Sequence, residues 1–338
     1  MIIKFLFFII FTLIVNHYIK LNNFLPSHTG DKHQSFVEKK NIQLTGGIFV
    51  LLIFLFFLNY DLILFTYLIL IFLLGFISDK KIINSAKLRF FLQFILIVGF
   101  VYQIDLNIDS TKLNYLDNLL TNQFFSYFFS LLCLMVLLNG SNFIDGLNGL
   151  LLGYFTIVLI ILNKIGLLDV LGLSESQSLC IILSLSFLLL LNFFNKLYLG
   201  DSGSYILSIF MGYVLISTYS LNDYISPYYV ILLLWYPCFE NLFSVLRKAR
   251  FNKSPIKPDN KHLHQLLFAY LKKKYKISNL KSNVTSSLLI NFYNLILILI
   301  ATINYKHSFF QVSLIFISTI IYLKTYMVLI DLNYKPKK

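Results

Sequence analysis

Long apolar runs separated by short polar segments dominate the pattern along the chain. A helix needs roughly 20 apolar residues to cross about 30 Å of hydrocarbon, and eleven runs approach or reach that length. The pattern therefore predicts an all-α, polytopic integral membrane protein with about eleven transmembrane helices. The predicted spans are 2–19, 46–58, 60–77, 89–104, 123–140, 146–163, 177–194, 205–220, 227–243, 285–303 and 309–331.

The composition excludes an ordinary soluble domain. Hydrophobic residues make up 58% of the 338 residues and charged residues only 13%, about half the charged share of soluble proteins. A bilayer can cover that much apolar surface. The longest loop has about 40 residues, so we expect one transmembrane domain over residues 1–338. Lys4 and the lack of a small-residue cleavage site make the first run a retained anchor.

The distribution of Lys and Arg predicts the orientation. With the N-terminus outside, 23 of the 28 basic residues fall in segments that face the cytoplasm, as the positive-inside rule requires. We therefore expect an outside N-terminus and a cytoplasmic C-terminus. This bias also explains most of the net charge of +13 without nucleic acid. The expected cytoplasmic loops are 20–45, 78–89, 195–204 and 244–284, followed by the tail 332–338.

Five polar clusters all fall on the predicted cytoplasmic side. Their gathering on one side was not an input to the count of Lys and Arg. Each has a bland alternative, such as a solvated loop, an interfacial residue or an ordinary helix cap. The clusters are 31–33 with 45–47, 78–80, 139–149, 199–204 and 247–265.

The densest cluster places Asn139, Asn142, Asp145 and Asn148 at every third position between two apolar runs. On a continuous helix this series would wind slowly around the axis. The glycines within it make a locally broken helix equally compatible. Buried Asn and Asp at membrane depth are costly and must find partners.

Two further aspartates need a positive partner. Asp79 follows an apolar run, and the C-terminal end of a helix disfavours an anion, so we expect Lys80, Lys81 or a metal ion beside it. Asp201 lies in a segment of Gly and Ser that opens the eighth run. The N–H groups of such a helix start favour a phosphate, and a divalent cation would reconcile that phosphate with Asp201. The alternative is a simple N-cap.

The basic segment 247–265 has two interpretations. Its cations could attract anionic lipid headgroups or hold a pyrophosphate. His262 and His264 share a face only in an extended stretch, and they form a weak metal pair without a third ligand.

Three motifs resemble those of the polyprenyl-phosphate N-acetylhexosamine-1-phosphate transferases, within glycosyltransferase family 4. They are Asn139-x-x-Asn142-x-x-Asp145-Gly, the segment 200–204 (Gly-Asp-Ser-Gly-Ser) and the segment 258–264 (Pro-Asp-Asn-Lys-His-Leu-His). The resemblance extends in family order from Asp31 to Gln265. Ser78 and Asn148 stand where this family usually has aspartates.

The resemblance implies a phosphotransferase reaction. A sugar-1-phosphate, by default N-acetylglucosamine-1-phosphate, would pass from a UDP-sugar to polyprenyl (undecaprenyl) phosphate with release of UMP. This would start the synthesis of a cell-envelope polysaccharide, at the cytoplasmic face of the bacterial inner membrane. The implied cofactor is Mg²⁺, with Mn²⁺ as the alternative. The implied partners are the UDP-sugar, the lipid phosphate and the membrane, with no nucleic acid, and a homodimer is left open.

The resemblance also implies roles for individual residues. The expected catalytic residues are Asp79, Asp145, Asp201, His262 and His264, and Asp201 and Asp145 are the expected metal ligands. The expected substrate-binding residues are His33, Asn139, Asn142, Asn148, Asn195, Arg247, Arg250 and Lys261.

A transporter or lipid flippase is the rival function. Such proteins carry ionisable residues near the bilayer midplane. Here charges in the middle of predicted spans are nearly absent. Glu240 and Lys324 are the exceptions, and Glu240 is near a cytoplasmic end. A structural scaffold would leave the clustered Asn, Asp and His residues unexplained, so the pattern favours an enzyme.

Overall fold

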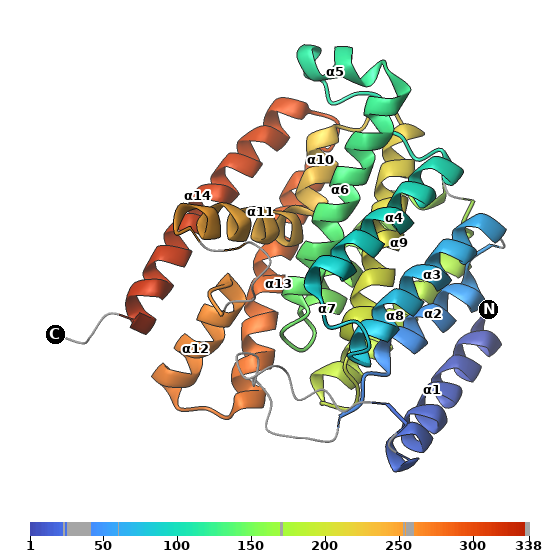
Figure 1. The fold of residues 1–338 in the computed structure, drawn as a ribbon, viewed down its shortest axis with the longest axis vertical. Coiled ribbons are helices and arrows are strands. Elements are labelled where there is room, and N and C mark those ends of the chain that lie inside the picture. The colour runs from blue at the N-terminus through green and yellow to red at the C-terminus, as the bar shows by residue number, and fades with distance from the viewer. Residues whose placement is uncertain are drawn as a thin grey trace.

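Helices joined by loops form the chain in the computed structural model, which describes residues 1–22, 24–25, 42–59, 61–169, 172–252, 254 and 260–334 (Figure 1). The helices are α1 (Ile2–Asn22), α2 (Gly46–Phe57), α3 (Leu62–Asp79), α4 (Ala86–Ile104), α5 (Asn114–Leu120), α6 (Gln123–Ile144), α7 (Leu150–Lys164), α8 (Glu175–Phe193), α9 (Gly200–Ser220), α10 (Pro227–Leu233), α11 (Trp235–Arg250), α12 (Leu263–Tyr275), α13 (Asn279–Ile303) and α14 (Ser308–Tyr334).

The helices confirm a polytopic, all-helical membrane protein. Every predicted apolar run falls on a helix or on the pair α10 and α11. Within the described residues, seven helices are long and apolar enough to cross a membrane, and the bent pair raises this to eight. The helices α2 and α7 are apolar but shorter. The number of eleven spans and the orientation therefore stay predictions.

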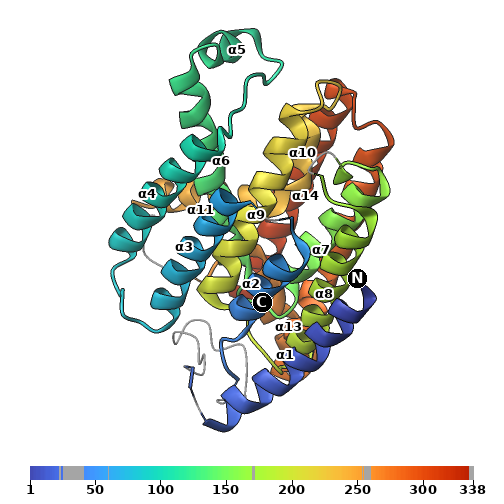
Figure 2. The same cartoon turned by 90° about the vertical axis from the view of Figure 1, so that its right-hand side faces the viewer.

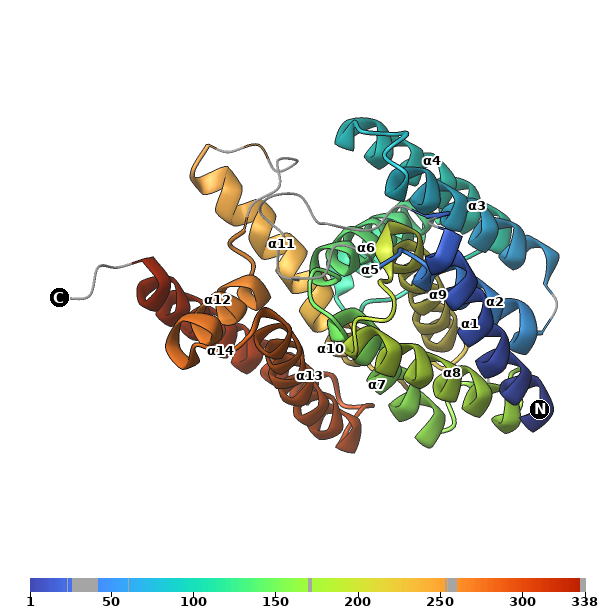
Figure 3. The ribbon, with the colours of Figure 1, turned by 90° about the horizontal axis from the view of Figure 1, so that it is seen from below.

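The predicted span 227–243 is not a single straight helix. The helices α10 and α11 meet at Leu234 with a bend of 81°. Pro237 explains the break, because a proline inside a helix lacks the N–H group and clashes with the carbonyl four residues earlier. The bend places Pro237 in the first turn of α11, where its missing N–H costs nothing. As a result α11 crosses the other helices at a steep angle (Figures 1 and 3).

The helix α9 forms the centre of the bundle, packed against α2, α3 and α6 (Figure 2). Most of its residues from Ser202 to Thr218 are buried. Small residues on α9 let neighbouring backbones approach, as is common between membrane helices. At the periphery, only 11% of the apolar window of α1 and 22% of those of α4 and α14 are buried, which leaves these helices to face lipid.

Two glycines bring the start of α2 and the end of α3 against the start of α9. A Cβ atom on Gly75 would lie 2.4 Å from the Ser202 Cα, and one on Gly47 would lie 2.3 Å from the Ser202 Oγ. Any larger residue would force these helices apart. The contact places Asp79, at the end of α3, directly beside the first turn of α9.

The polar clusters gather at one end of the bundle. The end of α3, the end of α6 and the start of α9 lie toward the same end as α12, whereas α5 lies at the opposite end (Figure 1). The helices α5 and α12 lie outside the predicted spans. The helix α12 packs against α13 and α14 at one side of this end (Figure 3).

Candidate functional site

Asp79 binds the N-terminal end of α9. One carboxylate oxygen accepts the Asp201 N–H at 2.8 Å, and the other accepts the Ser202 N–H at 3.0 Å and the Ser202 hydroxyl at 2.7 Å. The positive end of the α9 dipole therefore stabilises this anion. The expected partners Lys80 and Lys81 are both exposed, and the Lys80 ammonium lies over the Phe76 ring. The expectation of a lysine partner for Asp79 was wrong.

Asp201 lies at the centre of a network from four helices. Its Oδ2 accepts the Ser78 hydroxyl at 2.5 Å and an Arg89 N–H at 3.0 Å. Its Oδ1 accepts the Asn142 amide at 2.7 Å. The guanidinium of Arg89 also donates to the Ser78 hydroxyl at 2.8 Å. The Ser78 hydroxyl thus donates a hydrogen bond to Asp201, where a carboxylate would repel it.

Asp145 completes a group of three aspartates. It ends α6, and the break predicted as one alternative for 139–149 is real, since α7 begins only at Leu150. Burial raises the pKa of the Asp145 carboxyl well above its ordinary value, and the charges of Asp201 and Asp79 raise it further. A hydrogen bond from the Gly200 backbone opposes this shift. Three acidic groups thus converge where α3, α6 and α9 meet.

Whether the three aspartates can bind a divalent cation depends on their charge and on the number of oxygens free to coordinate it. In the described part of the chain, no three His, Cys, Asp or Glu side chains are arranged to hold a metal ion by themselves. Mg²⁺ does not need such a cage, because it is usually held by one or two carboxylates together with substrate phosphates and water. Both oxygens of Asp79 accept hydrogen bonds from backbone N–H groups at the start of α9. The oxygens of Asp201 accept hydrogen bonds from side chains only, which can move aside for a cation. Asp201 and Asp145, which repel each other, fit this two-carboxylate pattern.

The predicted asparagines separate into two groups. Asn142 contacts Asp201, whereas the Asn139 amide donates to the Met135 carbonyl within its own helix. Asn148 lies away from the aspartates in a cluster of amides, where its side chain donates to the Asn192 carbonyl and to Asn195 Oδ1. Asn195 is thus part of the support of this loop.

Residues of α13 hold the same loop from the other side. The Asn148 N–H donates to Asn283 Oδ1 at 2.7 Å, and the Asn291 amide donates to the Gly149 carbonyl at 3.0 Å. These amides fix the segment that follows Asp145, so the position of Asp145 depends on α13. Asn283 and Asn291 belong to none of the predicted polar clusters, so the sequence analysis did not find them.

The two histidines lie side by side at the start of α12. His262 is the N-cap residue in an extended conformation, and its ring stacks on that of His264 with 5.5 Å between centroids. The His262 ring also packs against Phe143, at 5.0 Å. A Cβ atom on Gly146 would lie 3.4 Å from His264 Nε2. The histidines therefore lie against the segment that carries Asn142 and Asp145.

The predicted cations belong to α11 and to the residue before His262. The Lys261 ammonium lies over the Tyr334 ring, 5.5 Å from its centroid. Arg247 donates to the Ser244 hydroxyl at 3.3 Å, and Arg250 is exposed at the end of α11. His33 lies outside the described residues.

Two charged residues of the site are absent from the sequence prediction. Arg89, near the start of α4, counted only toward the orientation. A cation near a helix N-terminus is unfavourable without an anion, which was the available signal. Glu240 is 1% exposed and accepts a hydrogen bond from His262; a carboxylate within a predicted span is a signal for a buried partner.

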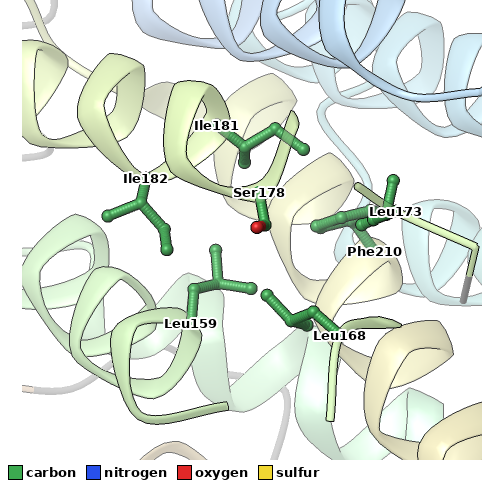
Figure 4. A pocket seen from close by; sticks show the side chains of 7 residues that line it. All are labelled: Leu159, Leu168, Leu173, Ser178, Ile181, Ile182 and Phe210. Atoms are coloured by element: carbon green, nitrogen blue, oxygen red, sulfur yellow. The ribbon is translucent and has the colours of Figure 1, made fainter. Parts of the chain in front are cut away.

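A small pocket lies elsewhere, between α7, α8 and α9 (Figure 4). Its lining is apolar apart from Ser178, whose hydroxyl donates to Asn163. Leu168 and Leu173, from the loop between α7 and α8, place it toward the opposite end of these helices from Asp201. Such a cavity suits neither a phosphate nor a sugar.

The part of the chain that carries the aspartates is similar to a known protein family. Residues 62–219 match the model of glycosyl transferase family 4. The matched stretch includes Arg89 and all three aspartates of the site, and it ends before the histidine pair.

Three relatives show the same similarity. A probable undecaprenyl-phosphate N-acetylglucosaminyl 1-phosphate transferase of Bacillus subtilis is 30% identical over 216 residues, which cover 60% of this chain and 56% of that protein. A decaprenyl-phosphate N-acetylglucosaminephosphotransferase of Mycolicibacterium smegmatis is 29% identical, over 39% of this chain and 37% of that protein. An undecaprenyl-phosphate alpha-N-acetylglucosaminyl 1-phosphate transferase of Escherichia coli O157:H7 is 25% identical, over 56% of this chain and 53% of that protein.

The similarity spans about half the length of these relatives or less. The stretch matched by the family model, 62–219, contains Asp79, Asp145 and Asp201. Through residues 62–219, this chain resembles glycosyl transferase family 4.

Proposed function

We propose that this chain transfers a sugar-1-phosphate from a UDP-sugar to polyprenyl phosphate and releases UMP. The donor would carry an N-acetylhexosamine, by default N-acetylglucosamine. The observation that carries the proposal is the convergence of three aspartates and Arg89 at one end of a membrane bundle. Two relatives that are 30% and 29% identical to part of this chain are named as transferases of N-acetylglucosamine phosphate to undecaprenyl or decaprenyl phosphate.

The proposed metal ligands are Asp201 and Asp145, with Mg²⁺ as the ion and Mn²⁺ as the alternative. Bound there, a divalent cation would neutralise the charge that develops on the departing UMP phosphate. The mutual repulsion of the two carboxylates, together with Asp79, supports this choice. Asn142 would keep Asp201 in orientation through its 2.7 Å hydrogen bond.

Asp79 has a different proposed role. Both of its oxygens accept hydrogen bonds from the first turn of α9, so it would position Asp201. A phosphate monoester is largely ionised at neutral pH, and the acceptor therefore needs no strong base. The helix start that the sequence suggested for phosphate is filled by protein carboxylates in this structure.

The phosphates of the two substrates would contact the aspartates on one side and the histidine pair on the other. His262, His264 and Lys261 would hold phosphate oxygens by hydrogen bonds, and Arg247 and Arg250 would attract the anionic substrates toward the site. We place this end of the molecule at the cytoplasmic face of the bacterial inner membrane, where UDP-sugars are made. The product would start a cell-envelope polysaccharide.

A test incubates membranes containing the protein with polyprenyl phosphate, Mg²⁺ and a panel of UDP-sugars. We expect UMP and one new lipid with the mass of a polyprenyl-diphospho-N-acetylhexosamine. Asp201→Asn should lower the rate by at least about 10²-fold, the order found when one transition-state stabilising group is lost. Asp223→Asn changes an exposed aspartate at the other end of α9 and should have no effect. Membranes that yield no lipid product from any UDP-sugar would refute the proposal.

A further inference from the structure

Glu240 is a buried carboxylate within α11. It is 1% exposed, and a charge removed from water is tolerated only when its oxygens are well bonded. Its Oε1 lies 3.0 Å from His262 Nδ1 and accepts the Leu263 N–H at 3.4 Å. Its Oε2 accepts the Tyr322 hydroxyl at 2.9 Å. The three partners His262, Leu263 and Tyr322 are themselves buried, so these hydrogen bonds are protected from water.

These contacts tie three separate elements together. Glu240 belongs to α11, His262 caps α12, and Tyr322 belongs to α14. A carboxylate beside Nδ1 fixes the orientation and tautomer of an imidazole. With Nδ1 directed at Glu240, the opposite edge of the ring carries Nε2. The same ring packs on Phe143, two residues before Asp145.

His264 depends on the same arrangement. Its ring is nearly parallel to that of His262, at 15°, and its Nδ1 lies 3.5 Å from the Tyr236 hydroxyl. Burial lowers the pKa of His264 to about 3, so this imidazole is neutral. Within the described residues its Nε2 has no hydrogen-bond partner. That buried nitrogen lies beside Gly146, next to Asp145, and is available to a ligand.

We propose that Glu240 is a positioning residue that, with Tyr322, orients His262 and the stacked His264 toward a phosphate bound against residues 143–146. The phosphate in this statement rests on the proposed function. The orientation of His262 does not, and it can be measured without turnover. Glu240 itself would touch neither the sugar nor the phosphates.

The kinetic test compares Glu240→Gln, Glu240→Asp and Tyr322→Phe. Loss of a group that orients a ligand typically costs about 10- to 100-fold, so we expect that drop in kcat/KM for Glu240→Gln. Glu240→Asp should recover part of the activity, and Tyr322→Phe should lose less than Glu240→Gln. The control is Tyr229→Phe, which removes an equally buried hydroxyl bonded to Thr302 and should leave kcat/KM unchanged. Equal losses in Tyr322→Phe and Tyr229→Phe would contradict the proposal.

The second test records nuclear magnetic resonance of the protein in detergent with ¹⁵N-labelled histidine, assigned with His262→Gln. The wild type should show His262 protonated at Nδ1, with the far-downfield proton of a carboxylate-bound imidazole. In folded Glu240→Gln that proton should move upfield. An unchanged Nδ1 signal in that variant would overturn the proposal, whether or not the wild type turns over a UDP-sugar.

Discussion

Asp201 shows at the scale of one residue how the site is balanced. Its carboxylate meets Ser78, Arg89 and Asn142 from three other helices. Arg89 is the only cation among these contacts, so it supplies the charge that a divalent ion would supply during the proposed reaction. Arg89 and the metal would compete for the same oxygen.

This competition predicts the effect of Arg89→Gln. Without the guanidinium, Asp201 should bind a divalent cation more tightly, because a competing and repelling charge is gone. The Mg²⁺ concentration for half-maximal activity should fall, by about tenfold if the pair contributes about 1.4 kcal/mol. A Mg²⁺ titration of UMP release measures this.

The matched control is Lys87→Gln, which removes an exposed cation two residues away on the same helix. It should leave the Mg²⁺ requirement unchanged. An unchanged or increased requirement in Arg89→Gln would show that Arg89 does not compete with the metal.

At the scale of elements, packing at the start of α9 brings Asp79 and Asp201 together. Gly75 lies on α3 where an added Cβ atom would meet the Ser202 backbone. Gly75→Ala should therefore separate α3 from α9 and destabilise the protein by about 1–3 kcal/mol, the usual cost of overpacking. The midpoint temperature of thermal unfolding in detergent and the rate of UMP release should both decrease.

Gly99→Ala is the comparison for this variant. Its added Cβ atom would first meet the Tyr67 hydroxyl at 2.6 Å, which is the far end of a side chain and can move. We expect little change in either measurement. If the two variants behave alike, the close approach of α3 to α9 is not what positions Asp79.

The elements also mark what the sequence could predict. Hydrophobic run length predicted all the apolar helices, because burial in a bilayer depends on composition alone. Run length alone does not show the bend at Leu234. Pro237 was the residue that could have predicted it. Run length also missed α12, whose lysines place it in a loop by charge although one of its faces is buried.

The site could be predicted only in part. Asp79, Asn142, Asp145 and Asp201 do lie together, and His262 and His264 lie against the same segment. The pairings of Arg89 with Asp201 and of Tyr322 with Glu240 could not be predicted, since the paired residues are 112 and 82 positions apart. Contacts over such separations depend on the packing of helices, which a single sequence does not encode locally.

For the whole molecule, the orientation in the membrane is the main prediction. The excess of Lys and Arg predicts that the end with the aspartates faces the cytoplasm. After replacement of Cys133, Cys180 and Cys238, single cysteines at Ile82 and Tyr115 can report on the two sides. These positions are 68% and 82% exposed, so both should react once they are accessible.

An impermeant maleimide applied to intact spheroplasts should label Tyr115→Cys at once. Ile82→Cys should react only after the membrane is permeabilised. The reverse pattern would place the aspartates outside and would remove UDP-sugars as substrates.

The central claim is that the phosphate travels with the sugar. The most direct measurement uses UDP-N-acetylglucosamine, or the active sugar of the panel, labelled in its β-phosphate. The account predicts that the label moves to the polyprenyl lipid while unlabelled UMP is released. Label that stays in the nucleotide as UDP, with the sugar alone on the lipid, would contradict it.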